Sequence, residues 1–133
     1  MKAITKFECH EIDDQTEPYR VVLWRVPPGP REDARIAERF DEKSIDVPKS
    51  FGSIWFQLWT WEGGSVAQAT FAADADAVRC DTITVHPTYR LRGIATRLYE
   101  AASESFQGPV VPSENQTPDA VAFWRGRKQI LHP

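Results

Sequence analysis

Residues 83–99, ITVHPTYRLRGIATRLY, decide how the chain is expected to fold. The apolar and β-branched residues 83–85 close a predicted strand, and Pro87 ends it because proline has no N–H for the ladder of hydrogen bonds. A basic turn with one glycine follows, and small or apolar residues then recur at helical spacing from Ile94. A strand, a basic turn and a helix in this order build an anion site, because the first N–H groups of a helix have no partner inside it and carry partial positive charge.

The turn differs from two glycine-rich loops that bind nucleotides. A dinucleotide-binding loop reads G-x-G-x-x-G and a mononucleotide P-loop reads G-x-x-x-x-G-K-[ST], whereas residues 90–95 read RLRGIA. The single Gly93 lets a phosphate come close to the backbone, and Arg90 and Arg92 add full positive charges. An ordinary strand-to-helix turn with solvated arginines is the alternative interpretation.

The pattern Arg90-x-x-Gly93-x-Ala95 resembles the pyrophosphate-binding loop of the GCN5-related N-acetyltransferase family, which reads Gln/Arg-x-x-Gly-x-Gly/Ala. In that family the loop follows a strand ending Val-x-Pro and opens a long helix with a leucine one turn later. Residues 85–87, VHP, and Leu98 stand at those positions here. The resemblance implies acetyl-CoA as the bound donor, held by Ile83, Thr84, Val85, Arg90, Leu91, Arg92, Gly93, Ile94, Ala95 and Thr96.

The composition indicates one domain, residues 1–133, without a membrane anchor. Hydrophobic residues make up 41% of the chain, which is enough for a core, yet no apolar run approaches the ~20 residues of a membrane span. Acidic residues interrupt the N-terminus where a signal peptide needs an apolar stretch, and the two cysteines imply no disulfide framework, so we expect a cytoplasmic protein. The net charge of −3 gives no general attraction to nucleic acid, and we expect neither nucleic acid nor membrane as a partner.

The remaining pattern predicts the elements around the basic turn. We expect helices at 31–40, 93–106 and 117–128, and strands at 2–10, 19–26, 53–61, 65–72, 78–85 and 108–112. The last two strands should be parallel, because a helix crosses over between them. This order predicts an α/β (α+β) fold similar to that of the N-acetyltransferase family: a mixed central sheet of about six strands flanked by three helices. The resemblance also implies that the family's C-terminal strands are truncated here.

The strand at 53–61 is apolar on both faces. Ile54 and Phe56 point to one side, and the neighbouring Trp55 and Trp59 point to the other. This pattern is typical of a central strand that is covered on both sides. We interpret the tryptophans as core residues rather than as an acceptor pocket.

Three side chains are candidates for catalysis: Asp81, Ser113 and Asn115. Asp81 is expected to share a face of its strand with Ile83 and Val85, because side chains alternate along a strand. A partly buried carboxylate there would have a raised pKa and could accept a proton from an amine, directly or through water. Ser113 and Asn115 follow the last predicted strand and could touch the thioester or the departing sulfur. For each of the three, a structural role is the alternative.

The last predicted helix lacks a residue that the family often has. The family frequently places a tyrosine there as the acid for the departing thiolate, and this chain has Phe123 and Trp124 in that neighbourhood. We interpret the basic residues that follow as a last helical turn whose charges are favourable with the helix dipole: Arg125, Arg127 and Lys128.

The motifs favour an N-acetyltransferase that moves the acetyl group of acetyl-CoA to an amine by direct attack in a ternary complex. The acceptor, a small molecule or a peptide, is constrained by no motif. The missing tyrosine leaves a second interpretation open, a CoA-binding module of the same fold with weak or no catalysis. A third is an interaction protein that uses the tryptophan-rich strand as its surface.

The predicted topology also bears on assembly. Val110 and Val111 should lie at an open edge of the sheet, beside the exposed aromatic residues Phe123 and Trp124. A self-complementary patch of this kind is covered most simply by a second copy of the chain. We therefore expect a homodimer with Phe123 or Trp124 at or near its interface.

Overall fold

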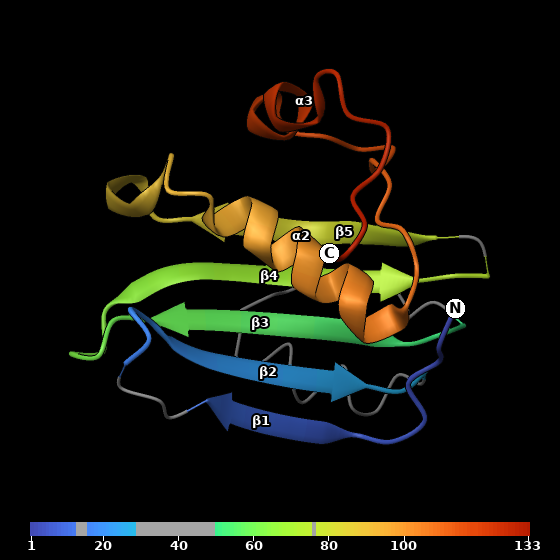
Figure 1. The fold of residues 1–133 in the computed structure, drawn as a ribbon, viewed down its shortest axis with the longest axis horizontal. Helices are drawn as coiled ribbons and strands as arrows, with labels where there is room; N and C mark the ends of the chain where they lie inside the picture. Colours follow the sequence, from blue (N-terminus) through green and yellow to red (C-terminus); the bar gives the residue numbers. More distant parts are fainter. Residues whose placement is uncertain (13–15, 29–49, 76) are drawn as a thin grey trace.

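The computed structural model describes residues 1–12, 16–28, 50–75 and 77–133. These residues form a five-stranded antiparallel sheet in the order β1-β2-β3-β4-β5, with α2 across one face and α3 beyond its β5 edge (Figure 1). Neither described helix is long and apolar enough to cross a membrane. The elements are β1 (Glu8–Ile12), β2 (Arg20–Val26), β3 (Ser53–Trp59), β4 (Ser65–Ala73), β5 (Val78–Val85), the 3₁₀ helix η1 (Pro87–Tyr89), α2 (Ile94–Phe106) and α3 (Pro118–Trp124).

Most of the predicted elements are present close to their predicted bounds. β5 has the predicted bounds, and β2, β3, β4 and α2 differ from theirs by at most two residues at each end. β1 begins at Glu8 rather than at residue 2, and α3 ends at Trp124 rather than at residue 128. The helix expected at 31–40 lies outside the described residues.

The sixth predicted strand is reduced to a single bridge. Val78 and Val110 pair in parallel, as predicted, through Val78 N–H to Pro109 O at 3.0 Å and Val111 N–H to Val78 O at 2.9 Å. In the described part of the chain no further bridge continues along β5. Pro109 and Pro112 lack the N–H groups that a longer ladder needs. The predicted α+β fold is therefore confirmed in its class, but not in its strand number: among the described residues the sheet has five antiparallel strands, and the sixth is a single parallel bridge.

The two-sided burial predicted for the central strand is confirmed. Ile54 and Phe56 pack in the main core with α2, whereas Trp55 packs in a second cluster with Val22 and Trp24 on the opposite face. Trp55 is 1% exposed, and its indole N–H donates to Ser53 Oγ at 2.9 Å. The tryptophan is a core residue, as interpreted from the sequence.

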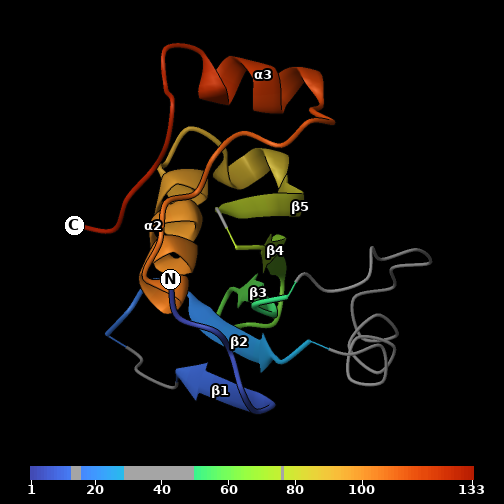
Figure 2. The same cartoon turned by 90° about the vertical axis from the view of Figure 1, so that its right-hand side faces the viewer.

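The helix α2 covers one face of the sheet with its apolar side. Figure 2 shows it lying along that face, and its buried residues include Leu98, Ala102 and Phe106. Its N-cap, Gly93, has φ 77°, a left-handed backbone that favours glycine. This glycine therefore sets where the helix begins and how the basic turn enters it.

The chain's own C-terminus covers the edge at which a partner was expected. Val110 N–H donates to Ile130 O at 2.9 Å and Ile130 N–H donates to Val110 O at 2.8 Å. Phe123 and Trp124 both pack on Tyr99 of α2, and Trp124 is 6% exposed. The predictions that this edge is open and that both aromatic side chains are exposed were therefore wrong. The homodimer stays a prediction, without the uncovered surface from which it was inferred.

The packing of α2 on the sheet gives a direct test of the fold. Phe106 is 0% exposed, so Phe106→Ala should lower the free energy of unfolding by about 3–5 kcal/mol, the usual loss for a buried aromatic ring. Chemical denaturation measures it. The half-exposed Leu131 provides the control, since Leu131→Ala should change little. Equal losses in the two variants would contradict the assignment of Phe106 to the core.

Candidate functional site

A cavity of about 700 Å³ lies between the end of β5, the basic turn, the first turns of α2 and the helix α3. It exists because, among the described residues, the edge of β5 that faces away from β4 is bridged at Val78 and no further, and because α3 stands away from the sheet (Figures 1 and 2). All but one of the residues that the sequence predicted to hold a donor line this cavity: Ile83, Thr84, Val85, Arg90, Leu91, Gly93, Ile94, Ala95 and Thr96.

The remaining predicted contact, Arg92, lies outside the lining. Its guanidinium carbon is 5.2 Å from the centroid of the Tyr89 ring, a cation–π contact. Tyr89 itself lines the cavity and meets the ring of Tyr19 edge-on at 5.8 Å. Arg92 therefore contacts a residue that lines the cavity without lining it itself.

The basic turn has a curved and strained backbone. Gly93 has φ 77° and Leu91 has φ 63°, although Leu91 is fully exposed and bulky. A left-handed backbone costs an ordinary residue about 1–2 kcal/mol, and such conformations cluster at binding sites. Turns with this curvature form anion-binding concavities from successive N–H groups.

The first turn of α2 keeps its N–H groups free of a side-chain cap. Gly93, as N-cap, has no side chain that could accept from them. Ile94, Ala95 and Thr96 line the cavity at this point. The partial positive charge of the helix N-terminus therefore lies at the cavity wall.

Arg90 adds a full charge at the same wall. Its Nε donates to Val85 O at 3.1 Å, and one of its terminal nitrogens is 3.9 Å from Asp119 Oδ2 of α3. Both side chains of this ion pair are exposed, so it contributes little stability. Arg90 thus joins the end of β5 to α3 across the cavity and is available to an anion.

Tyr99 is a wall residue that the sequence reasoning missed. Its buried ring stacks on Phe123 at 4.8 Å and 16°, and meets Trp124 edge-on at 5.3 Å. Its hydroxyl hydrogen-bonds with the side chains of Cys80 and Trp124, and burial raises the pKa of Tyr99 well above its usual value. The signal was present in the helical spacing, because Tyr99 stands four residues after Ala95 on the cavity side of α2.

Cys80 is held in a protonated state beside Tyr99. Its Sγ donates to Thr82 O at 3.2 Å, and burial raises the pKa of the Cys80 thiol to about 12. A nucleophilic cysteine needs the opposite shift. Among the described residues no group of His, Cys, Asp and Glu could hold a metal ion.

Asp81 does not occupy the position that strict alternation gave it. The pairing of β4 with β5 shifts register between Thr70 and Phe71, which oppose Thr82 and Cys80, so Asp81 is an extra residue at a bulge. The bulge brings Cys80, rather than Asp81, onto the core face. The expected partial burial of Asp81 was wrong, since the side chain is exposed and does not line the cavity.

The other two catalytic candidates are not brought into the cavity either. Ser113 is half-buried, and its hydroxyl donates to Cys80 O at 2.5 Å. Asn115 is exposed and is not part of the lining. Ser113 thus fastens the segment after Val110 to the bulge of β5.

Arg127 contributes a second cation that the sequence reasoning placed elsewhere. The helix α3 ends at Trp124, and Gly126 follows with φ 77°. Arg127 then folds back, with its guanidinium carbon 4.2 Å from the centroid of the Phe123 ring, and it lines the cavity. The expected helical turn at 125–128 was therefore wrong.

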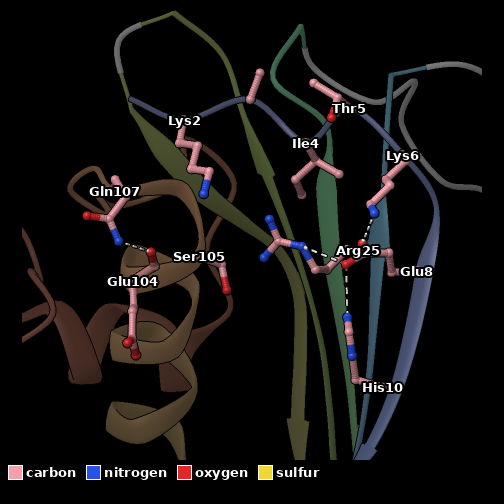
Figure 3. A pocket seen from close by; sticks show the side chains of 11 residues that line it. Lys2, Ile4, Thr5, Lys6, Glu8, His10, Arg25, Glu104, Ser105 and Gln107 are labelled. Atoms are coloured by element: carbon pink, nitrogen blue, oxygen red, sulfur yellow. Dashed lines mark hydrogen bonds and ion pairs between the residues drawn. The ribbon is translucent and has the colours of Figure 1, made fainter.

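A second hollow, of about 620 Å³, lies at the other end of α2. Figure 3 shows Lys6, His10 and Arg25 directed toward Glu8, with atom pairs at 3.1, 2.9 and 3.7 Å. The hydrogen bonds from His10 and then from Lys6 lower the pKa of Glu8. With Glu104, this carboxylate offsets two of the three full positive charges that line the hollow, those of Lys2, Lys6 and Arg25.

Comparison with known proteins gives one distant likeness. No family model matches the chain and no curated protein matches it. A crystal structure of a "putative acetyltransferase" from Exiguobacterium sp. 255-15 is similar at 17% identity, over 92% of this chain and 83% of that chain, with a TM-score of 0.45. A likeness this distant has no bearing on function, which has to be inferred from the cavity itself.

The hydrogen bond from Ser113 gives a test of how this side of the cavity is held. Ser113→Ala should lower the free energy of unfolding by about 1 kcal/mol, because the carbonyl of Cys80 loses its partner at a half-buried position. Ser105→Ala on α2 should cause no loss, since alanine favours a helix. Urea denaturation of the two variants compares them. An unchanged free energy of unfolding in Ser113→Ala would show that this hydrogen bond does not hold the segment against β5.

Proposed function

We propose that the chain binds acetyl-CoA in the cavity between β5 and α3 and transfers the acetyl group to an amine. The observation that carries this proposal is the gathering of residues 83–85 and 90–96, Arg92 excepted, around one cavity. The sequence motif predicts these residues as donor contacts, and the fold brings them to one cavity. A diphosphate-bearing ligand explains both their chemistry and their common position.

The proposed donor would bind in two parts. Its pyrophosphate would lie at the left-handed turn, where N–H groups of α2 and the guanidinium of Arg90 converge. Its pantetheine arm, which carries two amides, would run along residues 83–85, beyond the last bridge on that edge of β5. An amide chain beside an unpaired strand edge can form hydrogen bonds as an added strand does.

The reaction then needs few groups from the protein. The amine nitrogen forms a bond to the thioester carbonyl carbon, the C–S bond breaks, the nitrogen loses a proton and the thiolate gains one. The acceptor amine, of a small molecule or a peptide, would lose its proton to water. We assign the proton that the thiolate gains to water as well, since Tyr99 lines the cavity but burial raises the pKa of its hydroxyl and makes it a weak acid.

A second candidate function is donor binding without catalysis. It is favoured by the positions of the three predicted catalytic residues: Asp81 and Asn115 are exposed outside the cavity, and Ser113 is bonded to a backbone carbonyl. A CoA-binding module with this cavity would act through a partner or as a carrier of the thioester.

Calorimetric titration with CoA and acetyl-CoA, beside a thiol-release assay with a panel of amines, separates these functions. Binding with amine-dependent release of thiol is the result expected for the transferase. Binding without release would leave the second candidate. No binding of either ligand at millimolar concentration would overturn both.

The charge at the turn gives a sharper test of the binding site. Gly93→Asp should weaken CoA binding by at least about 2 kcal/mol, since a carboxylate would stand where the pyrophosphate approaches. The fold should survive at a cost of about 1–2 kcal/mol, because a Cβ at this position meets nothing within 4 Å and aspartate is one of the few residues that tolerate the left-handed backbone, here with φ 77°.

The matched control is Gly93→Asn, which has nearly the same shape and tolerates a left-handed backbone without adding charge. Its affinity, measured by the same calorimetry, should lie much closer to that of the original chain. Equal affinities in the aspartate and asparagine variants would place the phosphates elsewhere.

A further inference from the structure

The hollow at the other end of α2 is separate from the donor cavity. The N-terminal segment, the strands β1 and β2 and the last turn of α2 line about 620 Å³, a volume typical of small-molecule sites. The helix has 13 residues and is therefore about 20 Å long, with the basic turn at its opposite end. The two cavities share no lining residue.

Three groups that donate hydrogen bonds in this hollow are open to a ligand: the ammonium of Lys2, the terminal nitrogens of Arg25 and the hydroxyl of Ser105. Figure 3 shows these polar ends directed into the space between β2 and α2. Among the described residues, no carboxylate lies within ion-pair distance of Lys2, and the Ser105 hydroxyl forms no hydrogen bond. Two cations directed into one space repel each other, and an anion between them removes that repulsion.

The orientation of Arg25 is set by Glu8. Arg25 Nε lies 3.7 Å from Glu8 Oε2, and the side chain of Arg25 is 22% exposed. Lys6 and His10 contact the same carboxylate at 3.1 and 2.9 Å. Glu8 is therefore occupied by three neighbours, and the terminal nitrogens of Arg25 remain for a ligand.

The negative groups around the hollow do not occupy the space between these cations. The last carbonyls of α2 carry partial negative charge, but Phe106 O accepts from the Lys2 N–H and Glu104 O accepts from the Gln107 side chain, both at 2.6 Å. The Glu104 carboxylate points along α2, away from Lys2 and Arg25 (Figure 3). An anion could therefore approach the two cations without meeting this carboxylate.

We propose that the hollow binds the phosphate monoester group of a small polar molecule. The three terminal oxygens of such a group match an ammonium, a guanidinium and a hydroxyl that come from three different parts of the chain. A carboxylate has two oxygens and would leave one of these donors unused. Thr5 and Gln107 add polar groups to the lining, which suits a ligand that carries hydroxyl groups. This site does not depend on the proposed function.

The test is NMR titration of the ¹⁵N-labelled full chain with inorganic phosphate, at an ionic strength held constant with sodium chloride. Phosphate should cause saturable shifts of the amide signals of Lys2, Arg25 and Ser105. Acetate in place of phosphate should bind at least about fivefold more weakly, because it leaves one donor without an acceptor. Equal affinities for the two anions would overturn the assignment to phosphate. Absence of saturable shifts at these three residues would overturn the site.

Two variants test the donors singly by the same titration. Ser105→Ala removes a donor without changing the charge, so the dissociation constant for phosphate should rise about fivefold. Lys2→Gln should raise it at least about tenfold, because a hydrogen bond from a charged group is lost. Lys2 is exposed and Ser105 is half-buried on a helix, so both variants should fold.

Lys128→Gln is the matched control, since it removes the same charge from an exposed side chain outside the hollow. Its dissociation constant for phosphate should equal that of the original chain. An unchanged affinity in Ser105→Ala, or equal losses in Lys2→Gln and Lys128→Gln, would indicate a diffuse electrostatic effect and would overturn the site. Gly93→Asp should weaken CoA binding and leave the phosphate shifts in the hollow unchanged, so the failure of one proposal can be distinguished from the failure of the other.

Discussion

The cavity depends on one constraint: in the part of the chain that the structure describes, the outer edge of β5 forms a backbone bridge at Val78 and at no later residue. Two prolines flank the segment that pairs there, and they withhold the N–H groups needed to extend the ladder. The chain then leaves the sheet. The hydroxyl of Ser113 donates to Cys80 O and holds this segment against β5, and α3 begins five residues later at Pro118. With a longer sixth strand, residues 83–85 would be paired and no ligand could reach their backbone. The local sequence thus sets where the chain leaves β5, and the core contacts of Trp124 set where α3 returns.

The aromatic contacts between α2 and α3 determine the depth of this cavity. Tyr99 stacks on Phe123 and meets Trp124 edge-on, so α3 is held at one side of α2 by three rings. The same rings carry the functional groups inward, because Tyr99 places a hydroxyl near the β5 bulge and Phe123 supports a guanidinium. The side chains that pack α3 on α2 therefore also line the cavity, Tyr99 and Phe123 among them.

The sequence predicted the elements that follow a regular period and missed the features that break one. Hydrophobic alternation and helical spacing located β5 and α2 nearly to the residue, and most of the donor contacts that the basic turn predicts line the cavity. The bulge at Asp81 was not predictable, because one extra residue inverts the alternation without leaving a mark in composition. The position of Arg127 depends on the end of α3 at Trp124 and on the contact of its guanidinium with the Phe123 ring. Residue spacing in the sequence predicts neither feature.

The central claim is that a phosphate-bearing donor binds at the N-terminus of α2, and residue-resolved NMR tests it most directly. Titration of ¹⁵N-labelled chain with CoA should shift the backbone amide signals of Gly93, Ile94 and Ala95 most strongly, because their N–H groups would receive the pyrophosphate. The amides along residues 83–85 should shift next. Shifts confined to the hollow at the other end of α2, around Lys6, or no saturable shift at all, would contradict the account.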